Sequence, residues 1–174
     1  WYDYEIPMTE AAEIGTRKVI TDHSTVGIVI TTDGTVTDIP RQDYQEAEER
    51  VIRELQEIGK PFVVLLNSSD PTGERACAIS TEISGKYNVK CIPVNCLTLD
   101  ETAITALMRS LLFEFPLQEL DLYLPSCGEA LPLEHPIKSS VYQTVREEAR
   151  QLTRIRELDG ALEGMRGCDS IQGT

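Results

Sequence analysis

The feature that most constrains the fold is an alternation of short apolar runs with longer amphipathic segments. Apolar residues, many of them β-branched, fill 26–31, 62–66 and 89–94, and turn-forming residues follow the runs. Runs of this length and composition are typical of strands that are covered on both faces in a parallel sheet. We therefore expect three buried, parallel strands.

Helical segments separate these runs. Over 41–59 apolar residues recur at three- and four-residue steps among charged ones, which predicts an amphipathic helix that ends at Gly59. Further helices are expected over 73–86 and 100–112, and a short one over 10–20. Strand and helix in regular alternation predict right-handed crossovers and an α/β core.

The alternation of strands and helices ends after Phe115-Pro116, where a segment rich in proline and glycine begins. From Ile137 to Leu162 apolar residues form one stripe along an otherwise charged segment, which predicts a single long amphipathic helix. We therefore expect one domain over residues 1–116 and the start of a second over residues 117–174.

Charge and composition narrow the classes of partner and compartment. The net charge of −13 disfavours a nucleic-acid partner, because such affinity comes mainly from clustered Lys and Arg. No run approaches the roughly 18 to 20 apolar residues that cross a bilayer, and the first residues do not resemble a signal peptide. A cytoplasmic location is expected. The five cysteines are odd in number and form no C-x-x-C pair, which predicts reduced thiols at Cys77, Cys91, Cys96, Cys127 and Cys168.

Ligands of open parallel sheets bind outside the carboxyl ends of the strands, so the loops at 32–35, 67–70 and 95–97 are candidates. The middle loop reads Asn67-Ser68-Ser69-Asp70, the N-x-x-D pattern with which nucleotide hydrolases of the Ras-like and translation-factor class read a base. A Ser replaces the usual Lys of N-K-x-D, so guanine selectivity is not expected. The candidate nucleotide-binding residues are Asn67, Ser68, Asp70, Asn95 and Cys96.

The same loop has a plainer interpretation, since Asn, Ser and Asp also cap turns and helices in proteins of every function. Both interpretations remain open from the sequence. For Asp33-Gly34, at the end of the first run, an ordinary turn is favoured over a metal-binding acid.

A phosphate-binding loop is missing from the sequence. Nothing matches G-x-x-x-x-G-K-[ST], so no glycine-rich loop cradles phosphates and no adjacent hydroxyl holds magnesium. We assign no catalytic or metal-binding residue and expect no hydrolysis by this chain alone. The predicted fold class is α/β, built like the back half of a P-loop nucleotide hydrolase, with helices flanking a parallel sheet.

Several ordered strings resemble the stage IV sporulation protein A family, whose members are cytoplasmic ATPases of endospore-forming bacteria. The strings lie at 10–20, 22–25, 30–35, 44–54, 59–62, 87–89, 113–116 and 157–159. The resemblance therefore runs along nearly the whole chain. It implies a fragment whose Walker A loop lies upstream of Trp1 and whose polymer-forming C-terminal part is missing.

The resemblance further implies a parent protein that uses ATP and magnesium and assembles with itself into the base layer of the spore coat. Its expected location is the mother-cell side of the forespore surface. Its expected partners are copies of itself, a small amphipathic membrane-anchoring peptide and other coat proteins, so that contact with the membrane is indirect. The alternative is a non-catalytic scaffold with a degenerate nucleotide-binding fold, in which the stripe from Ile137 to Leu162 mediates assembly.

Overall fold

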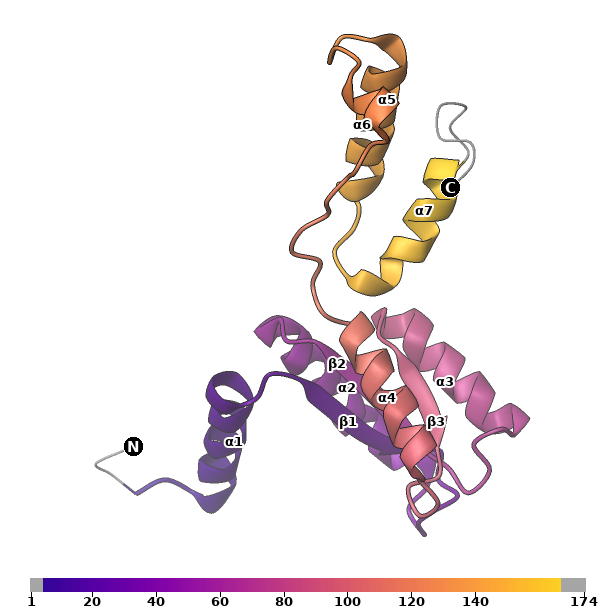
Figure 1. Cartoon of the computed structure of the whole chain (residues 1–174). Coiled ribbons are helices and arrows are strands. Elements are labelled where there is room, and N and C mark those ends of the chain that lie inside the picture. Colours follow the sequence, from indigo (N-terminus) through magenta and orange to yellow (C-terminus); the bar gives the residue numbers. More distant parts are fainter. Residues whose placement is uncertain (1–4, 167–174) are drawn as a thin grey trace. The chain divides into compact units, whose positions relative to one another are not determined.

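The computed structural model describes residues 5–166, and the chain divides into two compact units. The first ends at Leu111 and the second begins at Leu112. A β-sheet with helices on both faces forms the first unit, and helices joined by turns form the second (Figure 1). The domain boundary after residue 116 stays a prediction.

The sheet has three parallel strands in the order β1-β2-β3, as the sequence predicts. They are β1 (Gly27–Thr32), β2 (Phe62–Asn67) and β3 (Cys91–Val94). The first five residues of β2 are all buried, because this strand lies in the middle of the sheet with helices on both sides. A continuous apolar run is the sequence form that such a position requires.

Helices pack on both faces of β2. On one face Phe62, Val64 and Leu66 contact α2 (Arg41–Ile58) and α3 (Glu74–Tyr87). On the other face Val63 and Leu65 contact α4 (Glu101–Phe113). The predicted α/β architecture is confirmed, and the three helices begin and end within about two residues of their predicted bounds.

The edge strand β1 differs from the prediction, because it is covered on one face only. Val29 is buried against α2, whereas Ile28 and Ile30 on the opposite face are 44% and 64% exposed. The reason is the position of α4, which packs against β2 and β3 and leaves the adjacent face of β1 open. The expectation of full burial for this strand is therefore wrong.

The segment before β1 is a helix, α1 (Met8–Lys18), followed by a π-helical turn, η1 (Val19–His23). None of the residues of α1 is buried. The Lys60 ammonium group donates hydrogen bonds to the carbonyls of Ile20 and Thr21 at 2.6 Å each, and also to that of Ser24. These bonds satisfy carbonyl groups that the end of a helix leaves without intrahelical partners.

The second unit contains α5 (Ser126–Glu129), α6 (Pro136–Ala149), the short 3₁₀ helix η2 (Ile155–Glu157) and α7 (Leu158–Arg166). The expected single helix from Ile137 to Leu162 is therefore wrong: the chain turns between α6 and η2. The apolar spacing continues across this turn, which is why the sequence pattern does not reveal it.

Hydrogen bonds between residues that are distant in the sequence explain the turn between α6 and η2. The N–H of Ile155 donates to the carbonyl of Phe115, and the N–H of Leu117 donates to that of Thr153, both at 3.1 Å. The Glu157 carboxylate accepts from the N–H groups of Thr153 at 2.7 Å and Arg154 at 3.1 Å. These backbone bonds lower the pKa of Glu157 and use groups that a continuous helix would pair internally.

A buried carboxylate also anchors this turn. The side chain of Glu114 is 2% exposed and accepts hydrogen bonds from Arg154 at 2.7 Å and Arg156 at 3.1 Å. A buried charge is tolerated only when it is paired in this way. In the described part of the chain, no helix is long and apolar enough to cross a membrane.

Candidate functional site

The loops after the three strands lie together at the carboxyl-terminal end of the sheet, because all strands of a parallel sheet end on the same side. These loops contain residues 33–35, 67–70 and 95–97. Neighbouring strands bring them together in pairs, since Thr32 lies beside Asn67 and Asn67 lies beside Val94 in the sheet register. All five predicted nucleotide-binding residues lie in the second and third loops.

Asn67 and Cys96 are joined directly. The side-chain oxygen of Asn67 accepts a hydrogen bond from the N–H of Cys96 at 3.0 Å. The N–H of Ser68 donates to the carbonyl of Val94, the last residue of β3, at 2.9 Å, so two bonds tie the N-x-x-D loop to the end of β3 and the loop after it. Asn95 closes its own turn, because its side-chain oxygen accepts from the N–H of Leu97 at 3.0 Å.

Ser68 and Asp70 point to different environments. Ser68 is 1% exposed, and its hydroxyl accepts a hydrogen bond from the N–H of Asp70 at 3.1 Å. Asp70 is exposed, and its carboxylate accepts from the Thr72 hydroxyl at 3.2 Å. An added Cβ at Gly73 would lie 2.5 Å from the same carboxylate, so a larger residue there would displace the Asp70 side chain. Of these two side chains, only that of Asp70 is accessible to a ligand.

The sequence pattern favours only an ordinary turn at Asp33, yet the side chain of this residue makes contacts with two of the three loops. It is 1% exposed, and its carboxylate accepts from the Ser68 hydroxyl at 2.6 Å and from the Thr35 hydroxyl and N–H at 2.6 and 2.9 Å. The Arg75 guanidinium donates to the Asp33 carbonyl at 2.8 Å. Gly34 has a φ of 86°, so the predicted turn is present. The local signal is Asp-x-Thr, a turn pattern, and the contact with Ser68 has no local signature.

The electrostatics of Asp33 follow from these contacts. Burial alone acts to raise the pKa of its carboxyl group, but the hydrogen bonds from Ser68 and Thr35 favour the charged form. The pKa therefore lies below its ordinary value, and Asp33 is a carboxylate at neutral pH. Within residues 5–166, no three His, Cys, Asp or Glu side chains come together as metal ligands.

The cysteines of the described residues form no disulfide bonds. Cys77, Cys91, Cys96 and Cys127 are free thiols, of which Cys91 is buried, and Cys168 lies outside the described residues. Burial raises the pKa of Cys91 to about 11, which keeps its thiol protonated and unreactive.

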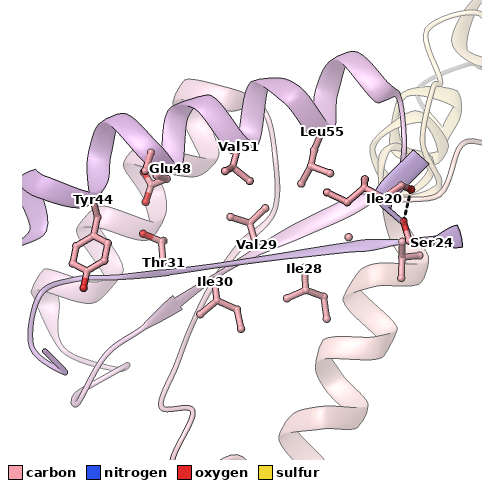
Figure 2. A pocket seen from close by; sticks show the side chains of 13 residues that line it. Ile20, Ser24, Ile28, Val29, Ile30, Thr31, Tyr44, Glu48, Val51 and Leu55 are labelled. Atoms are coloured by element: carbon pink, nitrogen blue, oxygen red, sulfur yellow. Dashed lines mark hydrogen bonds between the residues drawn. The ribbon is translucent and has the colours of Figure 1, made fainter. Parts of the chain in front are cut away.

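A groove runs along β1 beneath α2. Figure 2 shows Val29 and Thr31 pointing toward α2, while Ile28 and Ile30 point to the other side. The helix lines the groove with mostly apolar side chains, including Val51 and Leu55. Among residues 5–166, no strand pairs with the outer edge of β1, so the groove lies beside an open sheet edge.

Thr31 and Glu48 line a polar part of this groove, and both bind Arg41. The Arg41 guanidinium donates two hydrogen bonds to the Glu48 carboxylate, at 2.6 and 2.7 Å, and a third to the Thr31 hydroxyl at 3.1 Å. Because Glu48 is buried, this bidentate pair compensates for the cost of removing the carboxylate from water. The groove accepts apolar side chains better than a charged ligand.

Comparison with known proteins supplies the family. A family model described as "Stage IV sporulation protein A, ATPase domain" matches residues 1–116. The chain is 44% identical over 159 residues, 91% of its length, to stage IV sporulation protein A of Bacillus subtilis (strain 168), and it covers 32% of that protein. It is 40% identical over all 174 residues to the protein of the same name from Clostridioides difficile (strain 630), of which it covers 35%.

The chain thus spans about a third of the length of the curated relatives it matches. No solved structure was found to match it. The family match covers the sheet, its helices and all five candidate nucleotide-binding residues. The chain belongs to the stage IV sporulation protein A family, and its first 116 residues match the ATPase domain of that family.

Proposed function

We propose that residues 1–116 form the base-binding half of an ATP-hydrolysing P-loop domain in a longer protein that acts in sporulation. The observation that carries the proposal is the hydrogen bond from the N–H of Cys96 to the side chain of Asn67. In Ras-like hydrolases an Asn at this point of an N-x-x-D loop ties the neighbouring loops of the base pocket. Membership of a family with an ATPase domain supports the same conclusion.

The loop lacks the Lys of a guanine-selective N-K-x-D sequence, and the preference for ATP rests on the family match. Asp70 exposes a carboxylate, which can accept hydrogen bonds from the exocyclic amine of adenine or from the guanine edge and so does not itself distinguish the two bases. Ser68 stands where a Lys stem would lie along a guanine base, and its side chain is buried. In this proposal Asn67 and Cys96 shape the pocket, Asn95 holds the neighbouring turn, and Asp70 faces the base.

The phosphates of ATP and the magnesium ion need groups outside residues 1–174. No G-x-x-x-x-G-K-[ST] sequence occurs in these residues, so the backbone cradle and the lysine of a P-loop are supplied elsewhere in the protein. The open edge of β1, with the apolar groove beside it, supports this division, because a strand from elsewhere in the protein can pair with that edge.

The proposed biological role rests on membership of the family. The relatives carry the name of a protein of sporulation stage IV. We propose that ATP hydrolysis by the whole protein drives its assembly with further copies into the base layer of the spore coat, on the forespore surface within the mother-cell cytoplasm. A small amphipathic peptide anchors the assembly to the membrane, and other coat proteins bind to it.

The test compares full-length protein with residues 1–174, using calorimetric titration with ATP or GTP in the presence of magnesium, and an ATP hydrolysis assay. We expect the full-length protein to bind and hydrolyse ATP in preference to GTP, and residues 1–174 to bind either one far more weakly. Full-length protein that assembles but never hydrolyses ATP would support the non-catalytic scaffold and contradict the enzymatic proposal.

The site itself is tested with Asn67→Ala in the full-length protein. Loss of the bond to Cys96 should weaken ATP binding roughly tenfold, since a hydrogen bond of about 1.4 kcal/mol corresponds to that factor. Gln118→Ala is the matched control, because it makes a similar truncation at an exposed residue outside the three loops. Equal affinities for the two variants would place the base elsewhere.

A further inference from the structure

Two hydrogen bonds to side chains of the 33–35 turn hold the N-x-x-D loop, and a third within the loop extends them to Asp70. The Ser68 hydroxyl donates to Asp33 at 2.6 Å and accepts from the N–H of Asp70 at 3.1 Å. The N–H of Ser69 donates to the Thr35 hydroxyl at 2.9 Å. Residues 68 to 70 are therefore each held, directly or through Ser68, by a turn more than 30 positions earlier in the sequence.

These contacts exceed what the turn itself needs. One carboxylate oxygen of Asp33 accepts from the N–H and hydroxyl of Thr35, and these bonds close the turn. The second oxygen is committed to Ser68. A carboxylate that is 1% exposed requires strong hydrogen bonds to remain charged, and here they come from the nucleotide-binding loop as well as from the turn.

The direction of the bonds decides what Ser68 does. A hydroxyl has a single proton, and the proton of Ser68 goes to the Asp33 carboxylate. The oxygen of Ser68 is then fixed with its lone pairs available to the N–H of Asp70. Through Ser68, the buried Asp33 carboxylate therefore fixes the position of Asp70 at the exposed end of the loop.

We propose that Asp33 and Thr35 are positioning residues of the nucleotide base site: they hold residues 68–70 in the binding conformation without touching the nucleotide. This inference rests on the proposed function of the loop. Asp33 is buried beneath Ser68 and has no access to a ligand. The role predicts an effect on the base end of ATP and none on its phosphate end.

The experiment uses Asp33→Asn in the full-length protein. The amide keeps the size of the side chain and one acceptor for Thr35, but its nitrogen cannot accept from the Ser68 hydroxyl. We expect the KM for ATP to rise about five- to tenfold while kcat changes less than twofold. Inorganic triphosphate, a probe without a base, should inhibit the variant and the wild type with the same inhibition constant.

Thr35→Val provides a second variant if Asp33→Asn does not fold, because Thr35 lies at the surface and its hydroxyl accepts from Ser69. Its matched control is Thr37→Val, where the hydroxyl contacts Ile39 and Tyr44 rather than the loop. Thr35→Val should raise the KM for ATP and leave inhibition by triphosphate unchanged, whereas Thr37→Val should alter neither.

The outcomes separate this inference from the proposed function. If Asn67→Ala weakens ATP binding while Asp33→Asn and Thr35→Val leave the KM unchanged, the positioning role is wrong and the base site stands. If none of the three variants affects ATP, the proposed site is wrong as well. Equal losses of ATP and triphosphate affinity in Asp33→Asn would also overturn the inference, because they indicate general disruption of the domain.

Discussion

Buried carboxylates at Asp33, Glu48 and Glu114 show how single residues join segments that are distant in the sequence. Asp33 holds the loop after β2, and Glu48 binds Arg41, which in turn reaches Thr31 of β1. Glu114 binds two arginines about 40 positions later in the chain. Each carboxylate carries enough hydrogen bonds to offset the cost of its burial, so removal of any partner leaves a charge that water cannot reach.

Asp33 makes the stability of the folded state depend on pH, and the lowered pKa of its carboxyl group sets the direction of that dependence. Its charged form is favoured in the folded state, so its stabilising contribution is present above the ordinary Asp value of about 4 and is lost as pH falls through the folded pKa. In urea unfolding of residues 1–174, the wild type should lose more stability between pH 5 and pH 3 than Asp33→Asn. Asp121→Asn, at an exposed residue, serves as the control. An equal loss in wild type and Asp33→Asn would contradict the assignment.

The elements that the sequence predicts well are those whose pattern and environment agree. The helix expected over 41–59 is α2, because one apolar stripe packs on the sheet and Gly59 ends it with a φ of 73°. The expectation for 137–162 was wrong because long-range bonds to Phe115 and Leu117 replace the helical ones. Periodicity reports which residues face a core, but it does not report where distant backbone groups compete for the same hydrogen bonds.

The same distinction applies to the site. Parallel strands place their following loops together, so the proximity of Asn67 and Cys96 was predictable from the order of strands. The importance of Asp33 was not predictable, because its contact with Ser68 joins residues 35 positions apart and leaves no mark on the local pattern. Sequence alone correctly indicated a turn there and missed its function as a support.

The open edge of β1 leads to a prediction about hydrogen exchange. The N–H groups of Gly27 and Asp33 donate toward β2, so alternation along the strand directs those of Ile28 and Ile30 to the open edge. In residues 1–174 as a dilute monomer, the amides of Ile28 and Ile30 should exchange quickly while those of Val29 and Thr31 are protected. In the full-length protein the first pair should become protected. Slow exchange of Ile28 and Ile30 in the monomer would contradict an open edge.

At the scale of the whole molecule, we propose that the chain forms one part of a larger ATPase. The α/β unit provides the sheet and the loops that we propose to bind the base, and no G-x-x-x-x-G-K-[ST] sequence occurs in residues 1–174. The curated relatives are about three times longer than this chain, so the complete ATPase site requires residues beyond it in our proposal. Because a net charge of −13 repels the phosphates of ATP, it also favours a nucleotide site whose positive groups lie outside these residues.

The central claim is that the loops after β2 and β3 surround the base of ATP, and photolabelling tests it most directly. Full-length protein would be irradiated with 8-azido-ATP and magnesium, digested with trypsin, and mapped by mass spectrometry, with excess ATP as the competitor. We predict ATP-sensitive label in the peptides 54–75 and 91–109, which contain the two loops. Label that ATP displaces only from other peptides, such as 110–138, would contradict the account.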